Sequence, residues 1–190
     1  MTIDNCHYLG EFKNSLKEGF GYEENHEHKY EGEFRNDKKE GKGKLTYKTN
    51  NDVYEGEFSG NNITGTGYYI WSNGDTFQGT FLNGKMEGKG LYKWPDGGEY
   101  YGEYKNNIKE GNGKFKWSNG KTFEGPFVNG KPHGFGKLYI NDTPYDVQFK
   151  EGKLMHSKDK NSSLKSSEIS AKKNANASSL SKLSRSKNNS

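Results

Sequence analysis

The stretch YEGEFRNDKKEGKGKL, from Tyr30 to Leu45, decides the fold of this chain. It contains three aromatic or aliphatic side chains, three glycines, and charged residues at most of the other positions. A segment this polar has too little apolar surface to fold alone, because a stable interior requires buried apolar side chains. The stretch must therefore pack against other parts of the chain.

Copies of the same pattern recur at steps of 22 to 24 residues. An aromatic-x-Gly-x-aromatic segment begins at Tyr8, Tyr30, Tyr54, Phe77, Tyr100 and Phe123. Each leading aromatic is followed, 11 and 13 residues later, by a pair of glycines such as Gly41 and Gly43. A seventh start at Tyr145 has Val147 in place of the first glycine and no glycine pair behind it, as expected of a terminal, capping repeat.

The composition agrees with a repeat architecture better than with a disordered chain. Only 28% of the residues are hydrophobic, which is typical of disorder, but 14% are aromatic, which is not. The chain has 26 glycines, and most of them occupy the three glycine positions of the repeats. The glycines are therefore part of the folded architecture rather than of linkers.

Within each repeat, apolar side chains and glycines alternate with polar residues, which predicts two β-strands with one apolar face. The Asn83-Gly84 pair suits a two-residue hairpin turn with positive φ at both central residues. That register places Gly79 opposite Gly88 and Phe77 opposite Gly90, so that a ring can lie over bare glycine backbone.

Between repeats, a three-residue loop keeps the apolar faces consistent. A loop of Ser72, Asn73 and Gly74, with the glycine in the left-handed region, pairs Phe77 with Tyr69. On the outer face the predicted hairpin register places Glu31 opposite Lys42, and Gln78 opposite Lys89, as cross-strand polar pairs.

This pattern resembles the MORN repeat (membrane occupation and recognition nexus) over about residues 8 to 150. The resemblance implies an all-β fold, namely an elongated, twisted, single antiparallel meander of about six to seven β-hairpin repeats. The predicted organisation is a repeat sheet over residues 1–156 and a disordered basic tail over residues 157–190. Pro126 departs from the pattern, because it removes a backbone donor inside a strand and predicts a local bulge or weak pairing.

A sheet with little to cover it should leave part of its aromatic row exposed along a concave side, as expected of a partner-binding groove. Most of these rings are expected to pack on glycine and on one another. We assign partner binding first to the largest side chains and then to four leading aromatics. These are Trp71, Trp94 and Trp117, followed by Tyr54, Phe77, Tyr100 and Phe123.

From Ser157 onward the chain has twelve serines, no aromatic residue and no glycine, and such a composition predicts disorder. Its eight basic and two acidic residues give a net charge of +6, whereas the whole chain carries +4, so residues 1–156 carry −2. The repeat sheet is therefore not a basic platform for nucleic acid. The tail could contact anionic lipid, and phosphorylation of Ser184 or Ser186 would weaken that attraction.

The residues indicate no enzyme, no cofactor and no metal site. Cys6 and His7 are adjacent in sequence and lack a third group to orient them, and His26 and His28 around Glu27 fall short of a four-ligand metal site. The sequence has no apolar segment typical of a signal peptide or a membrane span. One cysteine and no signal peptide predict a cytoplasmic protein.

Two functions remain open. The first is a protein-interaction scaffold whose aromatic groove binds a helix or extended segment of a partner protein, or a second copy of this chain. The resemblance implies assemblies of the cytoskeleton, the cilium or the cell cortex as its setting. The alternative is a membrane-surface adaptor that binds acidic phospholipid, mainly through the basic tail.

Overall fold

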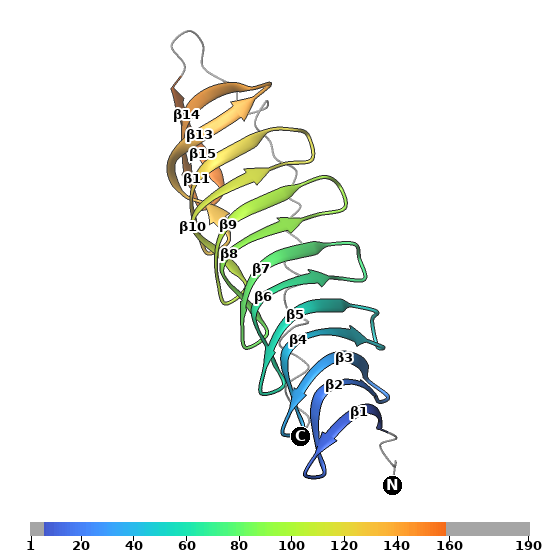
Figure 1. Ribbon diagram of the computed structural model, residues 1–190. Coiled ribbons are helices and arrows are strands. Elements are labelled where there is room, and N and C mark those ends of the chain that lie inside the picture. The colour runs from blue at the N-terminus through green and yellow to red at the C-terminus, as the bar shows by residue number, and fades with distance from the viewer. Residues whose placement is uncertain (1–5, 159–190) are drawn as a thin grey trace. The chain divides into compact units, whose positions relative to one another are not determined.

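The computed structural model describes residues 6–158, and within them the secondary structure is entirely β. Figure 1 shows hairpin after hairpin in chain order. The strands are β1 (His7–Lys13), β2 (Leu16–Glu24), β3 (His28–Arg35), β4 (Lys38–Tyr47), β5 (Val53–Ser59), β6 (Asn62–Ile70), β7 (Thr76–Leu82), β8 (Lys85–Lys93), β9 (Glu99–Lys105), β10 (Ile108–Lys116), β11 (Thr122–Val128), β12 (Lys131–Pro132), β13 (Gly134–Ile140), β14 (Thr143–Lys150) and β15 (Lys153–Lys158).

The sheet is a single antiparallel meander whose strand order follows the sequence, as the repeats predict; the two-residue strand β12 pairs with β11 beside this path. The chain divides into two compact units. The first comprises the residues up to Lys85 together with Tyr92–Pro95, and the second comprises Met86–Leu91 together with the residues from Asp96 onward. Strand β15 ends at Lys158, two residues past the expected end of the sheet at 156. The rest of the predicted tail lies outside the described residues.

The hairpin turns form as the sequence predicts. Asn83 and Gly84 have φ values of 49° and 73°, and the turn of the fifth repeat, Asn106 and Asn107, has 49° and 71°. Positive φ at both central residues gives the turn a twist that matches the twist of the flanking strands.

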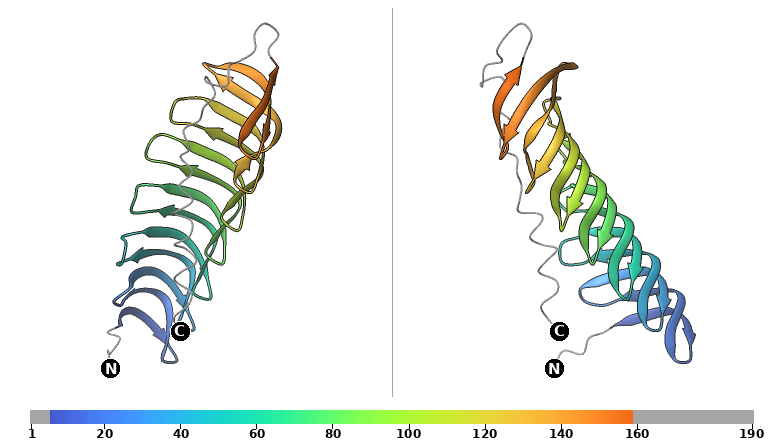
Figure 2. Two further views of the ribbon diagram at one scale, coloured as in Figure 1. Left: turned by 180° about the vertical axis from the view of Figure 1, so that it is seen from behind. Right: turned by 90° about the vertical axis from the view of Figure 1, so that its left-hand side faces the viewer.

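Beyond the turn, the predicted hairpin register is wrong by two residues. In β3–β4, Gly32 pairs with Gly43 rather than with Gly41, and Glu33 alone faces the three residues Glu40 to Lys42. This is a β-bulge, and the same irregularity separates the glycine pair from the turn in β1–β2, β5–β6 and β9–β10. A bulge bends its strand, and the hairpin strands are curved in both views of Figure 2.

The first glycine of each pair makes the bulge possible. Gly41 has a φ of 62°, in the left-handed region that a residue with a Cβ rarely adopts. The Glu33 side chain lies across it, and the Glu33 Oε1 atom accepts a hydrogen bond of 2.9 Å from the Lys42 N–H. The glutamate of the Tyr-x-Gly-Glu-Phe segment therefore satisfies a backbone donor that the bulge leaves without a strand partner.

The bulge also changes the pairs on the outer face. Glu31 lies opposite Lys44, not Lys42 as the sequence predicted, and Lys42 lies opposite Glu57 of the following repeat. The charges still alternate in sign across neighbouring strands. The outer face is therefore polar as expected, but it is paired in a different register.

The connection between repeats agrees with prediction. Tyr69 pairs with Phe77, and Gly74 has a φ of 87°. The Trp71 N–H donates to the Asp75 carbonyl oxygen at 3.0 Å, which closes the loop of Ser72, Asn73 and Gly74.

Pro126 lies within β11, opposite Asn112 of β10. Its carbonyl oxygen accepts a hydrogen bond of 2.9 Å from the His133 N–H, at the point where the facing chain is interrupted between β12 and β13. The weak pairing predicted around Pro126 is thus seen as a break in the neighbouring strand.

Candidate interaction surface

The inner face of the sheet is built on a row of aromatic rings that we call the ring ladder, formed by the first and fifth residues of the repeats. In the first unit it comprises Tyr8, Phe12, Tyr30, Phe34, Tyr54, Phe58, Phe77 and Phe81. In the second unit it comprises Tyr100, Tyr104, Phe123, Phe127 and Phe149. Successive rings meet edge to face, as aromatic pairs prefer.

A leading ring such as Tyr30 packs on glycine and on two other rings. Tyr30 contacts Phe34 of its own repeat and Phe58 of the next, with ring centroids 5.1 and 5.0 Å apart. The ring also lies over Gly32 and Gly43. Because these glycines have no side chains, the ring of one repeat can reach across a whole strand to the next repeat.

The hydroxyl groups of the leading tyrosines are satisfied within the repeat. Tyr30 Oη donates to the Glu33 carbonyl oxygen at 3.0 Å, and Tyr54 Oη donates to the Glu57 carbonyl oxygen at 3.1 Å. Burial raises the pKa of both phenols well above the ordinary value. The repeat can therefore use tyrosine or phenylalanine at this position, as Phe77 and Phe123 show.

The predicted exposure of the leading aromatics is wrong. Tyr54, Phe77, Tyr100 and Phe123 have no exposed surface, and Trp71 is only 4% exposed. The reason is that rings of neighbouring repeats cover Tyr54, Tyr100 and Phe123, and that Trp71 is packed between Tyr69 and Tyr92. These five side chains form the interior of the sheet, and they offer no free surface to a partner in this conformation.

The two other predicted tryptophans remain partly exposed. In the first unit, Trp94 lies at the end of a second aromatic row, with its ring centroid 4.7 Å from that of Tyr92, which in turn contacts Trp71. In the second unit, Trp117 is 4.9 Å from Phe115, and Phe115 is also partly exposed. Each unit thus presents an aromatic surface at its inter-repeat loops.

Trp71 has a polar atom without a partner. Its Nε1 is buried and makes no hydrogen bond. A buried donor left unsatisfied costs about 1 to 3 kcal/mol, which the packing of the indole between Tyr69 and Tyr92 must offset.

Two buried aspartates hold the loops at the end of the aromatic row, and sequence reasoning missed them. Asp52 Oδ1 accepts from the Ser72 N–H at 2.9 Å, and Asp52 Oδ2 accepts from Tyr69 Oη at 3.2 Å. Asp75 Oδ2 accepts from Tyr92 Oη at 2.8 Å. Each aspartate stands two residues before a leading aromatic, and this recurrence was the available signal.

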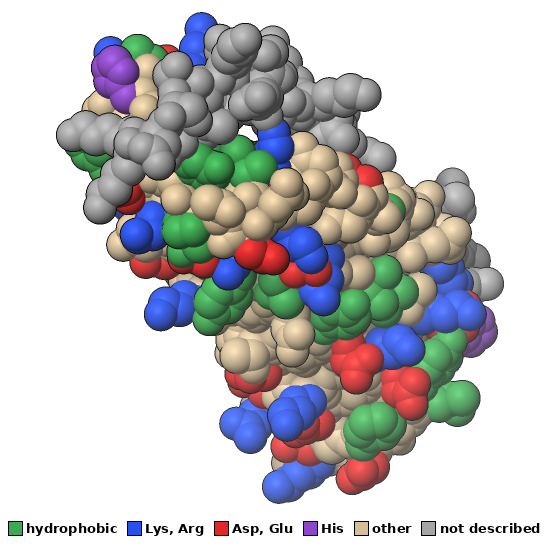
Figure 3. All heavy atoms as spheres, turned by 90° about the horizontal axis from the view of Figure 1, so that it is seen from above, with side chains coloured by type: hydrophobic (Ala, Val, Ile, Leu, Met, Phe, Trp, Pro, Cys, Tyr) green, Lys and Arg blue, Asp and Glu red, His purple; other side chains and the backbone are tan. Residues whose placement is uncertain are grey.

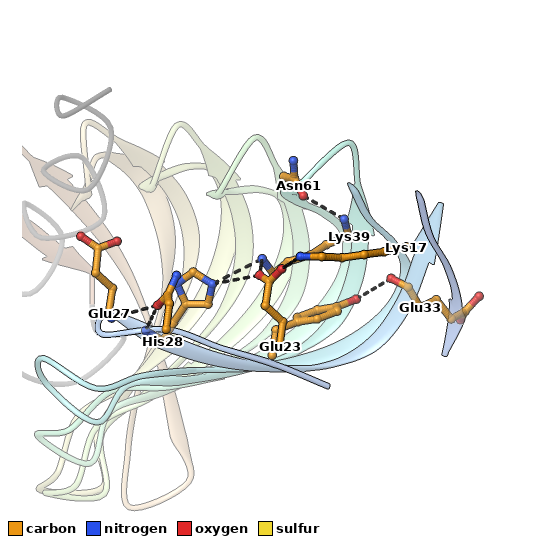
Figure 4. Close-up of polar contacts among 9 residues, drawn as sticks. Lys17, Glu23, Glu27, His28, Glu33, Lys39 and Asn61 are labelled. Carbon is orange, nitrogen blue, oxygen red and sulfur yellow. Dashed lines mark hydrogen bonds and ion pairs between the residues drawn. The ribbon is translucent and has the colours of Figure 1, made fainter. Parts of the chain in front are cut away.

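A charged cluster replaces apolar packing in the first repeat (Figure 4). Glu23 is buried at the repeat position that Leu45 and Tyr69 fill in the next two repeats. Its carboxylate pairs with Lys17, with Lys39 Nζ at 2.7 Å and with His28 Nε2 at 3.5 Å.

Three nearby donors account for the ionisation of this glutamate. His28, followed by Lys17 and Lys39, holds the pKa of the Glu23 carboxyl well below its usual range. Figure 4 shows the His28 ring turned toward Glu23 and the Glu27 side chain turned away from it. His28 and Glu27 therefore do not converge on a common ligand.

Lys109 occupies, in the fifth repeat, the position that Lys17 and Lys39 fill in the first two repeats. Its environment is different. Lys109 Nζ lies over the Tyr100 and Phe115 rings, 5.2 and 4.8 Å from their centroids. Burial lowers the pKa of Lys109 to about 8. Met86, fully buried, fills the equivalent position one repeat earlier, so methionine fits this site.

We expect Lys109→Met to remove a pH-dependent part of the stability. Between pH 8 and about 10.5 the unfolded chain retains a proton on Lys109 that the folded chain has lost, so the wild-type free energy of unfolding rises with pH in this window. The variant should lack that rise, and it should be more stable than wild type near pH 7. Urea unfolding at pH 7, 8.5 and 10 measures both effects.

Lys105→Met, an exposed change on the neighbouring strand β9, is the matched control and should retain the wild-type pH profile. Parallel profiles for wild type and Lys109→Met would contradict the assignment of the shift to Lys109.

Comparison with known families agrees with the repeat boundaries seen in the structure. The MORN repeat matches residues 8–24, 30–51, 54–76, 77–99, 100–122 and 123–142, which is more than half of the chain. The chain belongs to the MORN repeat family. The matched segments begin at the same six leading aromatics that start the ring ladder units. Comparison of this MORN-repeat protein with curated proteins gives no match.

Two other kinds of site are absent from the described part of the MORN-repeat protein. Residues 6 to 158 contain no helical segment long and apolar enough to cross a bilayer. Within the same range, no three His, Cys, Asp or Glu side chains are grouped to hold a metal ion. The predicted phosphorylation sites, Ser184 and Ser186, lie outside the described residues.

Proposed function

We propose that this MORN-repeat protein is a non-enzymatic scaffold that binds an extended or helical segment of a partner protein. The contact residues are Trp94 in the first unit, and Phe115 and Trp117 in the second. One observation carries this choice: these rings are partly exposed, whereas the ring-ladder side chains from Tyr30 to Phe149 are buried. Tryptophan is among the residues most enriched where binding energy concentrates.

The surface charge supports a protein partner over a polyanion. In Figure 3, acidic and basic side chains are mixed over the face in view, without a large block of one sign. The repeat region carries a net charge of −2 by sequence, whereas a nucleic-acid platform would be strongly basic. The protein is proposed to act in the cytoplasm, within a cytoskeletal, ciliary or cell-cortex assembly, the setting that the family resemblance implies.

Site-specific photo-crosslinking with the full-length chain tests the scaffold. A photoreactive phenylalanine analogue is placed at Trp94 or Trp117, and, as controls, at Tyr101 or Phe135. The controls are exposed and face the opposite side of their strands. We expect a discrete crosslinked partner from the first two positions only.

The alanine variants give the complementary result. Trp94→Ala together with Trp117→Ala should abolish capture of that partner, whereas Phe135→Ala should not. Equal crosslinking from both faces, or capture unaffected by the double change, would refute the assignment of these rings.

The basic tail favours a second candidate, a contact with acidic phospholipid. Its net charge of +6 would attract an anionic surface at roughly 1 kcal/mol for each basic residue near the membrane. In sedimentation with phosphatidylserine vesicles, full-length protein should bind at low salt. Binding should be removed when all eight basic residues of the tail are replaced with Gln, namely Lys158, Lys160, Lys165, Lys172, Lys173, Lys182, Arg185 and Lys187. Binding that survives these changes would place the lipid contact on the repeat sheet instead.

A further inference from the structure

The ring ladder is complete at its C-terminal end and incomplete at its N-terminal end. Phe149 of the partial seventh repeat packs on Phe123, with ring centroids 4.8 Å apart, and is buried. Phe12, at the equivalent position in the first repeat, contacts only Tyr8 among the ladder rings and is 62% exposed. The five corresponding rings of the intervening repeats are 1 to 3% exposed, and Phe34, Phe58, Phe81 and Phe127 each also contact the leading aromatic of the preceding repeat. Phe12 therefore lacks one leading ring.

The outer face of the first hairpin is also more apolar than that of the second repeat. Leu9 is 74% exposed and Phe20 is 56% exposed. The same positions of the second repeat hold Glu31 and Lys42, which make the outer face polar. Both faces of the first hairpin thus expose apolar side chains beside an open edge, a combination that soluble sheets ordinarily avoid.

The backbone of β1 can accept another strand. Among the described residues 6–158, β1 is the first strand of the sheet and has a hydrogen-bonded neighbour, β2, on one side only. Lys13 and Leu16 flank the two-residue turn, and pairs in that position exchange both backbone hydrogen bonds. Alternation along β1 then directs the N–H and C=O groups of Tyr8, Gly10 and Phe12 to the open side.

We propose that a second copy of this chain pairs with the open edge, β1 against β1 in antiparallel orientation, with Gly10 opposite Gly10 on a two-fold axis. Gly10 is the central residue of His7–Lys13, so this register pairs the whole strand. It places Tyr8 of each copy opposite Phe12 of the other. The first strand of each copy then covers the exposed Phe12 of the other.

The proposed contact repeats one that the chain makes within itself. Gly21 pairs with Gly32, and Gly43 with Gly56, where one repeat adjoins the next. In the proposed dimer, the two Gly10 residues at the two-fold axis likewise pair glycine with glycine, and the Tyr8 ring of each copy lies over its own Gly10. Directly opposite residues of neighbouring antiparallel strands bring their Cβ atoms to about 5 Å, within reach of two aromatic rings.

A head-to-tail contact with the other end of the sheet fits less well. Strand β15 has the sequence KLMHSK, with no glycine to lie beneath a ring and no aromatic residue to pack on Phe12. β15 also has no acidic residue that could pair with the basic side chains of His7 and Lys13. In the proposed register, by contrast, Glu11 of β1 lies diagonal to His7 of the second copy. The chemistry of the edge therefore selects a closed dimer over a filament.

Sedimentation equilibrium of the full-length chain tests the dimer. We expect a concentration-dependent rise from the chain mass of 21.5 kDa to twice that value. Phe12→Lys places a charge at the edge and should weaken the dimer by about tenfold or more. Phe135→Lys, a change of the same type at an exposed site away from the edge, should leave it intact.

Disulfide trapping tests the register. In a Cys6→Ser background, Leu9→Cys chains mixed with Glu11→Cys chains should form a crosslinked dimer, because these positions lie directly opposite each other. Leu9→Cys mixed with Phe135→Cys should not. A monomer at every concentration, a dimer unaffected by Phe12→Lys, or equal trapping in both mixtures would overturn the proposal. Partner crosslinking at Trp94 and Trp117 would stand or fall separately, because those residues lie outside β1.

Discussion

Replacing Phe58 with Ala should lower the free energy of unfolding by about 4 kcal/mol, in the range measured for buried phenylalanines. Phe58 is buried between two leading rings, Tyr30 and Tyr54, with centroids 5.0 and 5.3 Å away. Truncation removes an edge-to-face contact with each ring and opens a cavity that glycine-lined strands cannot fill with other side chains. Urea unfolding followed by circular dichroism measures the loss.

The matched control for this prediction is Phe135→Ala. Phe135 is the same residue type in a strand of the same sheet, but it is 75% exposed. Its truncation should cost less than about 0.5 kcal/mol, as for ordinary surface changes. Similar losses at both sites would mean that the ring ladder is not the main source of stability.

Replacing Gly56 with Ala should cost about 3 kcal/mol, the upper part of the range for overpacked interiors. A methyl group at this position would lie 2.6 Å from Gly67 Cα and 2.7 Å from the Thr66 carbonyl oxygen, and it would collide with the Tyr54 ring. The first two obstacles are backbone atoms of the neighbouring strand, so relief requires the strands to separate. Faster amide hydrogen exchange in β5 and β6 should accompany the loss of stability.

Gly84→Asn separates this clash from the general cost of losing a glycine. Gly84 has open space around it and a φ of 73°. Asn adopts the left-handed region more readily than most residues, and the Asn106-Asn107 turn already has this sequence. The control should lose less than about 1 kcal/mol. If Gly56→Ala lowered the free energy of unfolding by as little as this control, the Tyr54 ring would not lie directly on the glycine backbone.

Much of the sheet could be predicted because its rules are local. The Asn83-Gly84 turn and the Ser72-to-Gly74 loop each follow from the φ values that their residues tolerate, and the loop length sets the pairing of Tyr69 with Phe77. The hairpin bulge could not be found in the same way. It inserts two residues, and an even insertion leaves every side chain on its expected face, so the alternation in the sequence is the same with and without it.

The misassigned surface has a different cause. Whether Tyr54 or Trp117 is exposed depends on the positions of aromatic rings in other repeats. The sequence of a single repeat does not show where those rings lie. The Glu23 cluster is a similar case, because Lys17 and Lys39 come from two successive repeats and meet the carboxylate only when these repeats are stacked.

The amino-acid sequence by itself determined the period, the two strands of each repeat, their turns and the family, because each depends on residues close together in the chain. Only the tertiary structure decided which aromatic rings are interior, which glycines form bulges, and that Phe12 is left at an open end of the ring ladder. The physical reason is that burial depends on all the neighbours of a side chain in space, and in this sheet the decisive neighbours are about one repeat away.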